Sequence, residues 1–591
     1  MLGRAIALKP AKLSLPGIAI DVAIASVAIA VVAAPMVVRA NEPLDFVNHL
    51  WLTWVAGKAL VAAGHPAYFI NTTTEGVFNP FFAFYGGTLY NLTGAVSELT
   101  GHPYLAYVVV TVLAIAAAYV GTLALARQFG LRGLIAHAPA LTVITSAYFI
   151  TNLYGRGAWT EFMAVAALPT LAASAVNLVR SPAWRPWPVL VFVISAVILS
   201  GSHNLTLLWS LTIGGGVLVI VWFALGRPRS LPYRRFAMIV GLGVVAGLIN
   251  SWFLITDIAY AHDVAAGVTN TGAYGAFDSP AFLFDPFRSA PSASAFPAIY
   301  VQVPDWFLAW GVVAGAMLLW HREASERLRA VWITAVITVI IVLGLIMGPF
   351  WTFAPYPWAD TQLPFRLNSY VVFAVAGIVL AAGLALQRAP VYERRLRNLA
   401  RLRSALIIVT AVSVLLCLWQ EVVPSTTVPG YYVNRHVAFV SDTVLPPSWY
   451  AGCPYCDISA PIVPTAPAGR TLVINPASVH GNRFAGSVDV PPGLAPIQTN
   501  IAGGRYVVKL VGLRWLGRNP QGFAIVARLR NGHGPLHIVI EAADTNALEI
   551  GWILSIVAVA AVFVILAYTV MTTWRTARRR RVRPAGLVQG D

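Results

Sequence analysis

The sequence predicts a mainly α-helical bundle that crosses a membrane many times, with a small β-rich domain near the carboxyl terminus. Of its 591 residues, 58% are hydrophobic and only 11% are charged, whereas soluble domains carry about 25% charged residues. Apolar runs close to the roughly 20 residues that a spanning helix needs recur along the chain. Basic residues gather between alternate runs, as they do on the cytoplasmic side of membrane proteins.

The apolar runs, taken in order, predict about 12 spans. They lie at 18–38, 104–126, 134–154, 160–179, 188–200, 205–225, 236–255, 307–320, 330–350, 367–386, 405–419 and 550–571. A basic segment precedes the first run, but this run exceeds the signal-peptide core of about 7–15 residues. We therefore expect it to remain as the first span.

The distribution of charge predicts the sidedness. The formal net charge is +17, and a cytoplasmic amino terminus places most Lys and Arg in the inner segments, including the arginine-rich stretches 388–403 and 575–583. Both termini are then cytoplasmic. The basic tail directly follows a span, where it anchors the topology or contacts anionic lipid. Nucleic acid is therefore not an expected partner. Rare lysine beside abundant Ala, Val and Arg suggests a GC-rich bacterium, and hence its plasma membrane.

Three regions are expected. Residues 1–421 form the helical membrane domain, 422–548 an extracytoplasmic β-rich domain, and 549–591 the last span with its cytoplasmic tail. Within the first region, long outer loops are expected at 39–103 and 257–305. The first loop should contain an amphipathic interfacial helix with Trp51 and Trp54 at the membrane surface, and the second is a candidate lid.

The β-rich domain is predicted from alternating apolar residues at 505–511 and 523–529, between Gly, Asn and Pro turns. It could form a small sandwich. Cys453 and Cys456 lie in the same region. A redox pair would need a βαβ context, which is absent here, so either a local disulfide or two free thiols is expected.

The first candidate site residues follow the first span. Asp45 and His49 are four residues apart, so one helix would carry them on the same face. The carboxylate can take a proton from a hydroxyl or bind a metal, and the histidine can orient it or share the proton. The alternative is a helix-capping aspartate with an interfacial histidine. Lys58, further along, is a candidate for substrate binding.

The next candidates flank a tight outer turn, Gly155-Arg156-Gly157, that leads into the fourth run. Arginine's planar fork suits a phosphate or a carboxylate. Glu161 enters the membrane region, where an ionised side chain needs a partner, so it is a candidate catalytic residue. A structural pair between Arg156 and Glu161 is the alternative.

Two more outer segments carry candidates. His203 lies at a Gly/Ser break between two runs, where a wet cavity or a structural role is possible. Arg366 can bind a phosphate, and Asp360 or Gln362 can bind hydroxyls, unless this segment only anchors the chain at the interface. All of these residues share one predicted side of the membrane. The absence of a P-loop and of zinc spacing disfavours ATP-driven transport and metalloprotease activity.

These motifs together resemble those of bacterial GT-C membrane glycosyltransferases. The resemblance lies in Asp45 of the first loop, Gly64-His-Pro-Ala-Tyr, Asn79-Pro-Phe-Phe-Ala-Phe-Tyr-Gly-Gly, Gly155-Arg-Gly-Ala-Trp-Thr-Glu161, Ser202-His203-Asn204 and Leu363-Pro-Phe-Arg366. It spans roughly residues 45–403. The branch most similar to it is that of 6-pyruvoyl-tetrahydropterin-synthase-related membrane proteins. The β-rich segment has no such likeness.

The resemblance implies transfer of a sugar from a polyprenyl-phosphate donor to an envelope glycan or glycolipid outside the cytoplasm. Asp45 would be the general base, Arg156 and Arg366 would hold the phosphate, and His203 would assist. In a mycobacterium or a relative, an arabinosyl- or mannosyltransferase using a decaprenyl-phosphate sugar would be natural. The first loop lacks an acidic pair, so a divalent cation stays an open question. The β-rich domain would bind the acceptor glycan.

A different class of function is a non-enzymatic lipid or glycan transporter, or a scaffold for envelope assembly. A transporter of this size commonly shows two related halves and a site near the membrane midplane. This sequence shows no internal repeat, and its candidate polar residues gather on one predicted side. The enzyme is therefore the leading hypothesis.

Overall fold

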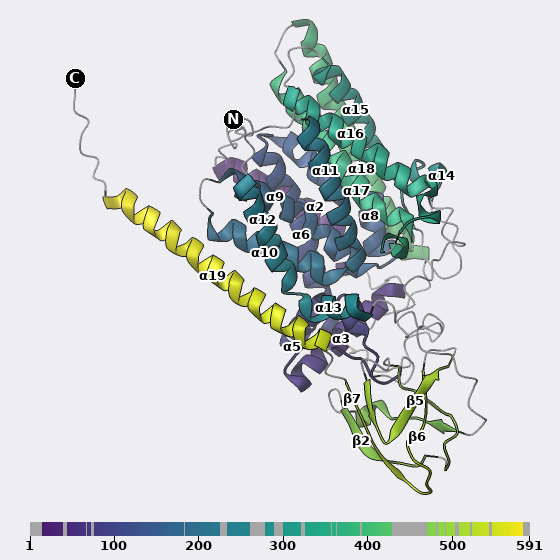
Figure 1. Ribbon diagram of the computed structural model, residues 1–591. Coiled ribbons are helices and arrows are strands. Elements are labelled where there is room, and N and C mark those ends of the chain that lie inside the picture. Colours follow the sequence, from purple (N-terminus) through teal and green to yellow (C-terminus); the bar gives the residue numbers. More distant parts are fainter. Residues whose placement is uncertain are drawn as a thin grey trace.

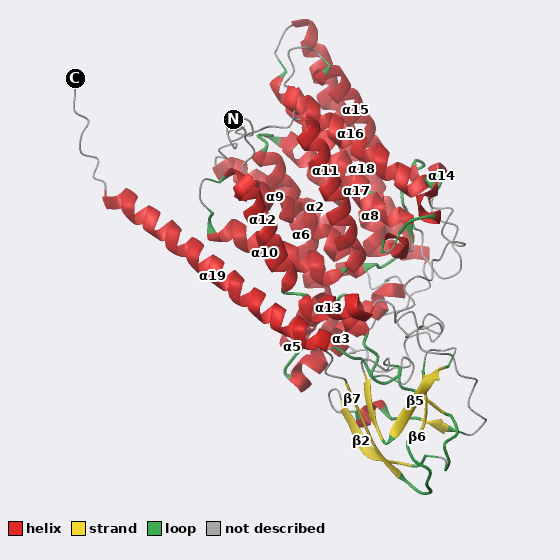
Figure 2. Ribbon diagram, viewed as in Figure 1, coloured by secondary structure: helices red, strands yellow, loops and turns green. Residues whose placement is uncertain are grey.

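The computed structural model (Figures 1 and 2) is a helical bundle with a small β-sandwich at one end. It describes residues 15–38, 44–66, 68–71, 76–181, 184–224, 233–260, 278–288, 299–320, 326–355, 357–361, 363–389, 393–427, 470–479, 483–490, 492–502, 508–519, 523–542 and 546–582. The pair Cys453 and Cys456 and most of the candidate lid lie outside these residues.

The bundle is built from long apolar helices that pack side by side. They are α2 (Leu15–Val38), α6 (Pro103–Gln128), α9 (Trp159–Arg180), α10 (Pro186–Ser202), α11 (Asn204–Ala224), α12 (Tyr233–Leu248), α15 (Asp305–Leu319), α16 (Glu326–Met347), α17 (Asn368–Arg388) and α18 (Glu393–Thr427). Most of α17 is buried, so this helix lies in the middle of the bundle.

Shorter elements connect the long helices, and several of them close one end of the bundle. They are α3 (Leu44–Ala63), α4 (Phe81–Phe84), α5 (Gly87–Thr100), η1 (Leu134–His137), α7 (Ala138–Ile144), α8 (Ala147–Ile150), the π-helix η2 (Thr151–Gly155), α13 (Ser251–Tyr260), α14 (Pro280–Leu283), η5 (Pro349–Thr352), η6 (Trp358–Thr361) and η7 (Pro364–Leu367). In Figure 1, α3, α5 and α13 lie between the bundle and the sandwich.

The chain is a multi-pass membrane protein, but the expected count of about twelve spans is not confirmed. Among the described residues, seven helices are long and apolar enough to cross a membrane, and two bent helix pairs raise the number to nine. The runs expected at 188–200, 205–225 and 307–320 correspond to the apolar helical stretches Pro186–Ser202, Asn204–Ile220 and Asp305–Leu319, each shorter than the 18 residues taken as the minimum for a span.

The carboxyl-terminal region contains the expected strands and forms two sheets. One has the order β1-β3-β6-β5 and the other the order β2-β7-β4. The strands are β1 (Thr471–Leu472), β2 (Arg483–Val488), β3 (Ile497–Thr499), β4 (Val508–Val511), β5 (Leu513–Arg518), β6 (Ala524–Arg528) and β7 (Leu536–Ala542). The last helix, α19 (Asn546–Val582), starts beside the sandwich and slants away from it, ending clear of the other helices. The sandwich and the arginine-rich tail therefore lie at opposite ends of α19.

The first outer loop forms the expected helix, α3, but one detail of the prediction is wrong. Trp51 is only 5% exposed and belongs to the main hydrophobic core, so it does not lie on a membrane surface. The reason is that α3 packs directly on α5: a Cβ atom added at Gly57 would lie 2.6 Å from the carbonyl oxygen of Gly94. Two glycines let these backbones make contact, which holds α3 against the bundle.

The other end of the bundle contains a largely buried cluster of polar side chains that joins three elements. The Asp21 carboxylate of α2 accepts hydrogen bonds from Arg127 of α6, with Nε at 3.2 Å and Nη2 at 2.5 Å. His137 Nε2 lies 3.0 Å from the same carboxylate, and its Nδ1 lies 2.8 Å from the hydroxyl of Tyr119. Every charged group in this cluster has a partner, so it joins α2 to α6 and η1.

Candidate functional site

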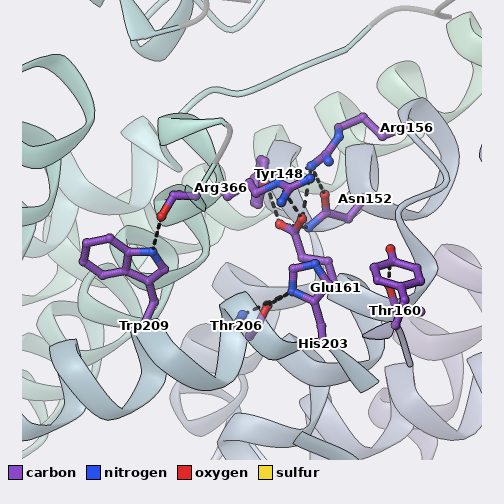
Figure 3. A network of polar contacts seen from close by, with 11 residues as sticks. Tyr148, Asn152, Arg156, Thr160, Glu161, His203, Thr206, Trp209 and Arg366 are labelled. Atoms are coloured by element: carbon purple, nitrogen blue, oxygen red, sulfur yellow. Dashed lines mark hydrogen bonds and ion pairs between the residues drawn. The ribbon is translucent and has the colours of Figure 1, made fainter. Parts of the chain in front are cut away.

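A buried polar cluster surrounds Glu161 in the first turn of α9 (Figure 3). Its Oε1 accepts a hydrogen bond from the Tyr148 hydroxyl at 2.6 Å and one from Asn152 Nδ2 at 3.4 Å. Its Oε2 lies 3.3 Å from Arg156 Nη1 and 3.4 Å from Arg366 Nε. Glu161 is 2% exposed and Arg156 is 7% exposed. The structural pair that the sequence left open as an alternative is therefore present, but with a second arginine.

The local backbone explains how three of these side chains meet. Tyr148, Asn152 and Arg156 follow one another at intervals of four residues through α8 and η2. The π-helical turn is closed by a 2.7 Å hydrogen bond from the Arg156 amide to the Thr151 carbonyl, and such turns occur frequently at functional sites. Gly157, with φ of +68°, then turns the chain into α9, which returns Glu161 to the same place.

Arg366 arrives from a distant part of the sequence through η7. The neighbouring Phe365 is fully buried, and its ring lies 5.4 Å from the Arg156 guanidinium and 6.2 Å from the Tyr148 ring. A guanidinium over an aromatic face is attracted by the ring's negative charge. Phe365, the neighbour of Arg366 in η7, therefore places this turn against Arg156.

His203 lies at the break between α10 and α11, beside Glu161 (Figure 3). It is 3% exposed, and its Nδ1 accepts the Thr206 amide at 3.1 Å and lies 2.8 Å from the Thr206 hydroxyl. The helix break thus uses one ring nitrogen to cap α11. The structure brings His203, Arg156, Glu161 and Arg366 together, while their chemical roles remain predictions.

His49 borders this cluster through aromatic side chains. Its Nδ1 lies 2.5 Å from the Tyr90 hydroxyl, and its ring centroid lies 6.5 Å from that of Tyr85 and 6.0 Å from that of Trp159. Burial lowers the pKa of His49 to about 3, although a hydrogen bond with the Gly157 backbone opposes this shift. His49 is therefore neutral near pH 7, which favours orienting a neighbour over carrying a proton.

Other predicted site residues are only partly described or lie elsewhere. Position 45 is in α3, one turn before His49, but the side chains of Asp45 and Asp360 and the whole of Gln362 lie outside the described residues. Lys58 Nζ lies 2.9 Å from Glu98 Oε2, in an ion pair where the lysine side chain is 56% exposed. No contact between Lys58 and the Glu161 cluster is recorded in the described part of the chain.

The charges in the cluster do not cancel. Among the described side chains, two guanidiniums, Arg156 and Arg366, face the single carboxylate of Glu161. The Nε atom of Arg366 is buried and has no hydrogen-bond partner in the described part. Buried charges are normally paired. Counted over the described side chains, the cluster therefore carries one more positive than negative charge, which suits an anion.

A divalent cation fits this cluster poorly, because its one carboxylate is already engaged by two guanidiniums and a phenol. Across the described residues, no group of three or more His, Cys, Asp or Glu side chains is placed to hold a metal ion. The cluster itself gives no support to metal chemistry.

Asp278 is a further acidic residue near the cluster, at the described end of the second outer loop. It accepts a hydrogen bond from the backbone amide of Phe365, and burial raises its pKa to about 7. Its Oδ1 is buried without a hydrogen-bond partner among the described residues. Asp278 was not predicted as a site residue, because the sequence around it does not distinguish it from other acidic residues in loops.

Tyr148, Asn152 and Tyr85 also belong to this site and were not predicted from the sequence. A signal was present for the first two, since Tyr148, Asn152 and Arg156 share one face of a helix at intervals of four residues. For Tyr85 the signal was the motif Asn79-Pro-Phe-Phe-Ala-Phe-Tyr-Gly-Gly, but its four aromatic residues give no reason to single out Tyr85.

Comparisons with known proteins give a distant structural likeness. No family model matches the chain, and no curated protein matches its sequence. The arabinofuranosyltransferase AftD from Mycobacteria matches with 15% identity and a TM-score of 0.41, over 70% of this chain and 27% of AftD. ArnT from Cupriavidus metallidurans, in a structure bound to undecaprenyl phosphate, matches with 14% identity and a TM-score of 0.39, over 69% of this chain and 76% of ArnT.

This chain thus spans about a quarter of the AftD chain that it matches. The apo structure of ArnT gives a TM-score of 0.37 at 14% identity. At this level of similarity, the likeness assigns no activity, ligand or residue role to this chain.

Proposed function

We propose that this chain is a membrane glycosyltransferase that moves a sugar from a polyprenyl-phosphate donor to an envelope glycan or glycolipid acceptor on the extracytoplasmic side. The observation that carries the proposal is the convergence of Arg156 and Arg366 on one buried carboxylate. In surroundings of low dielectric constant, an excess positive charge attracts an anion strongly. The planar guanidinium matches the geometry of a phosphate.

The two arginines differ in their availability to a phosphate. Arg156 Nη1 already donates to Tyr148 at 3.1 Å and to Asn152 at 3.2 Å, besides its contact with Glu161. The side chain of Arg366 is 16% exposed, and its contact with Glu161 is a 3.4 Å ion pair. We therefore assign the main phosphate contact to Arg366 and a supporting contact to Arg156. Glu161 is a positioning residue that holds both guanidiniums.

The proposed reaction is a single displacement at the sugar. The acceptor hydroxyl oxygen forms a bond to the anomeric carbon while the bond from that carbon to the phosphate oxygen breaks. The hydroxyl proton passes to the carboxylate of Asp45, and the electron pair of the broken bond stays on the polyprenyl phosphate. A base and a cationic leaving-group site are what this chemistry requires. Neutral His49, one turn along α3, orients the base, and His203 contacts the donor beside Arg366.

The test is complementation of a deletion strain, with the cell-envelope glycan linkages compared by mass spectrometry. The wild-type gene should restore one missing linkage, and Asp45→Asn and Asp45→Ala should not, although both proteins reach the membrane in normal amounts. Asp489→Asn is the matched control, because Asp489 is an exposed acid at the end of β2, and it should restore the linkage.

Two outcomes contradict the proposal. Restoration of the linkage by Asp45→Ala would remove Asp45 as the base. A deletion strain that lacks no linkage but accumulates or mislocalises a lipid would favour the transporter or scaffold instead.

A further inference from the structure

The sandwich is joined to the first outer loop by backbone hydrogen bonds. The Val77 amide donates to the Asn500 carbonyl at 2.8 Å, and the Ala502 amide donates to the Val77 carbonyl at 2.9 Å. Val77 and Ile501 thus form a parallel bridge, and a second bridge between Ile70 and Asn79 closes the loop on itself. Residues 76–79 therefore continue the sheet that contains β3.

The residues on either side of Val77, Gly76 and Phe78, both have a positive φ angle. Gly76 has φ of +82°, and a Cβ atom there would lie 2.5 Å from the Asn500 carbonyl oxygen and 2.8 Å from the Phe523 ring. Phe78 has φ of 58° and is fully buried, and it is the one residue other than glycine with positive φ in the described part of the chain. Such a conformation persists only where the surroundings enforce it.

The surroundings here are a hydrophobic core shared between the loop and the sandwich. The loop contributes Tyr68, Phe69, Val77 and Phe78. The sandwich side of this core comprises Leu472, Ile474, Phe484, Val490, Ile497, Ile501, Val508, Leu513, Ala524, Val526, Ile538 and Ile540. A shared core of this kind fixes the loop against the sandwich, in contrast to the loose contact of a tethered module.

The same loop leads directly to the candidate site. From Pro80 the chain forms α4 and reaches Tyr85, whose hydroxyl lies 2.5 Å from the Thr160 hydroxyl, next to Glu161. The Tyr85 ring lies 6.5 Å from His49 and 6.0 Å from His203, measured between centroids. Tyr85 is thus the side chain that links α3, α9 and the helix break at His203.

We propose that the β-sandwich is a positioning element of the candidate site, which holds residues 76–79 and thereby places Tyr85 between His49 and His203. Tyr85 is a further residue of this site. The sandwich then contributes to the geometry of the membrane domain, whatever glycan it binds. The proposal concerns this geometry and does not depend on which reaction the site performs.

The test is hydrogen exchange, read by mass spectrometry on the full chain in lipid nanodiscs. Gly76→Val should break the pairing with Asn500 and raise exchange severalfold in residues 76–79 and also in residues 85–90. Gly101→Val is the matched control: Gly101 has φ of +68°, but a Cβ atom there meets nothing within 4 Å. The control carries the same kind of backbone strain and should change neither segment. Exchange in α17 serves as an internal reference for the bundle.

A milder variant covers the case in which Gly76→Val fails to fold. Ile501→Ala truncates a fully buried side chain of the shared core and keeps the backbone pairing. It should raise exchange in the same two segments by a smaller factor. If either variant loosens residues 76–79 while residues 85–90 stay as protected as in the wild type, the proposal is overturned. This readout requires no enzymatic activity, so it stands apart from a failure of the proposed sugar transfer.

Discussion

The excess of positive charge among the described side chains around Glu161 predicts that Arg366→Gln costs less folding stability than Glu161→Gln. In Arg366→Gln one guanidinium is lost, so Arg156 and Glu161 remain as a balanced pair. The lost contact is a 3.4 Å ion pair with a partly accessible arginine, and we expect it to cost about 1 kcal/mol. In Glu161→Gln, the buried guanidinium of Arg156 and the largely buried guanidinium of Arg366 remain without a carboxylate among the described side chains. Breaking a buried pair in this way costs about 3–5 kcal/mol.

A bound phosphate should narrow the difference in stability between these two variants. A ligand at 100 times its dissociation constant stabilises a protein by about 2.7 kcal/mol, and we expect undecaprenyl phosphate to do so for the wild type. Undecaprenyl phosphate should stabilise Arg366→Gln much less, because the charges of the remaining described pair, Arg156 and Glu161, cancel without it. Glu161→Gln should gain more than the wild type, because the anion replaces the missing carboxylate.

The assay is thermal unfolding in nanodiscs with and without undecaprenyl phosphate. Melting temperatures are compared as a ranking, because a chain with more than one core need not unfold in one step. The reasoning is refuted if the lipid phosphate stabilises Arg366→Gln as much as the wild type. It is also refuted if Arg366→Gln is as unstable as Glu161→Gln, since the three residues would then form a purely structural group.

Two further predictions concern stability. Burial raises the pKa of Asp278 from 3.8 to about 7, so the folded state retains a proton that the unfolded state releases. Relative to Asp278→Asn, the wild type should therefore lose stability as the pH rises from about 4 to about 7, and it should lose no more above that range. Thermal unfolding of both proteins across this pH range measures the difference, and a constant difference would contradict it. At Gly94, a Cβ atom would lie 2.5 Å from the backbone nitrogen of Gly57, so Gly94→Ala should force α3 and α5 apart and cost about 1–3 kcal/mol. At Gly215 in α11 an added Cβ atom would meet nothing within 4 Å, so Gly215→Ala should be neutral or stabilising by up to about 1 kcal/mol. Equal melting temperatures for Gly94→Ala and Gly215→Ala would refute the close approach of α3 and α5.

The helices and much of the polar cluster were predictable because an apolar chain makes its exceptions visible. Arg156, Glu161 and Arg366 stand out as charges beside membrane spans, where each needs a partner. The alternation of basic loops then predicted that these three residues, which lie in separate segments, share one side of the membrane. That Glu161 would join both arginines was beyond the sequence, because the meeting point depends on how α9 and η7 pack.

The remaining details depend on backbone geometry that composition does not encode. The π-helix at Thr151–Gly155 shifts Arg156 by one residue relative to an α-helix, and no residue type there demands it. Trp51 is buried because α3 packs into the bundle, and the close approach of Gly57 to Gly94 joins two different segments. Tyr85 lies within the motif Asn79-Pro-Phe-Phe-Ala-Phe-Tyr-Gly-Gly, but its contact with Thr160 depends on how the segment after α4 packs on α9.

The bridge between Val77 and Ile501 has a consequence for the order in which this protein is made. Its two strands are separated by roughly four hundred positions along the chain, which corresponds to a delay of about 20–85 seconds during synthesis. Throughout that interval the loop after α3 presents unpaired amide and carbonyl groups, an edge to which other chains can attach. Premature termination ahead of β3 would leave that edge open for the lifetime of the product, so truncated copies should be prone to aggregate and be removed by quality control.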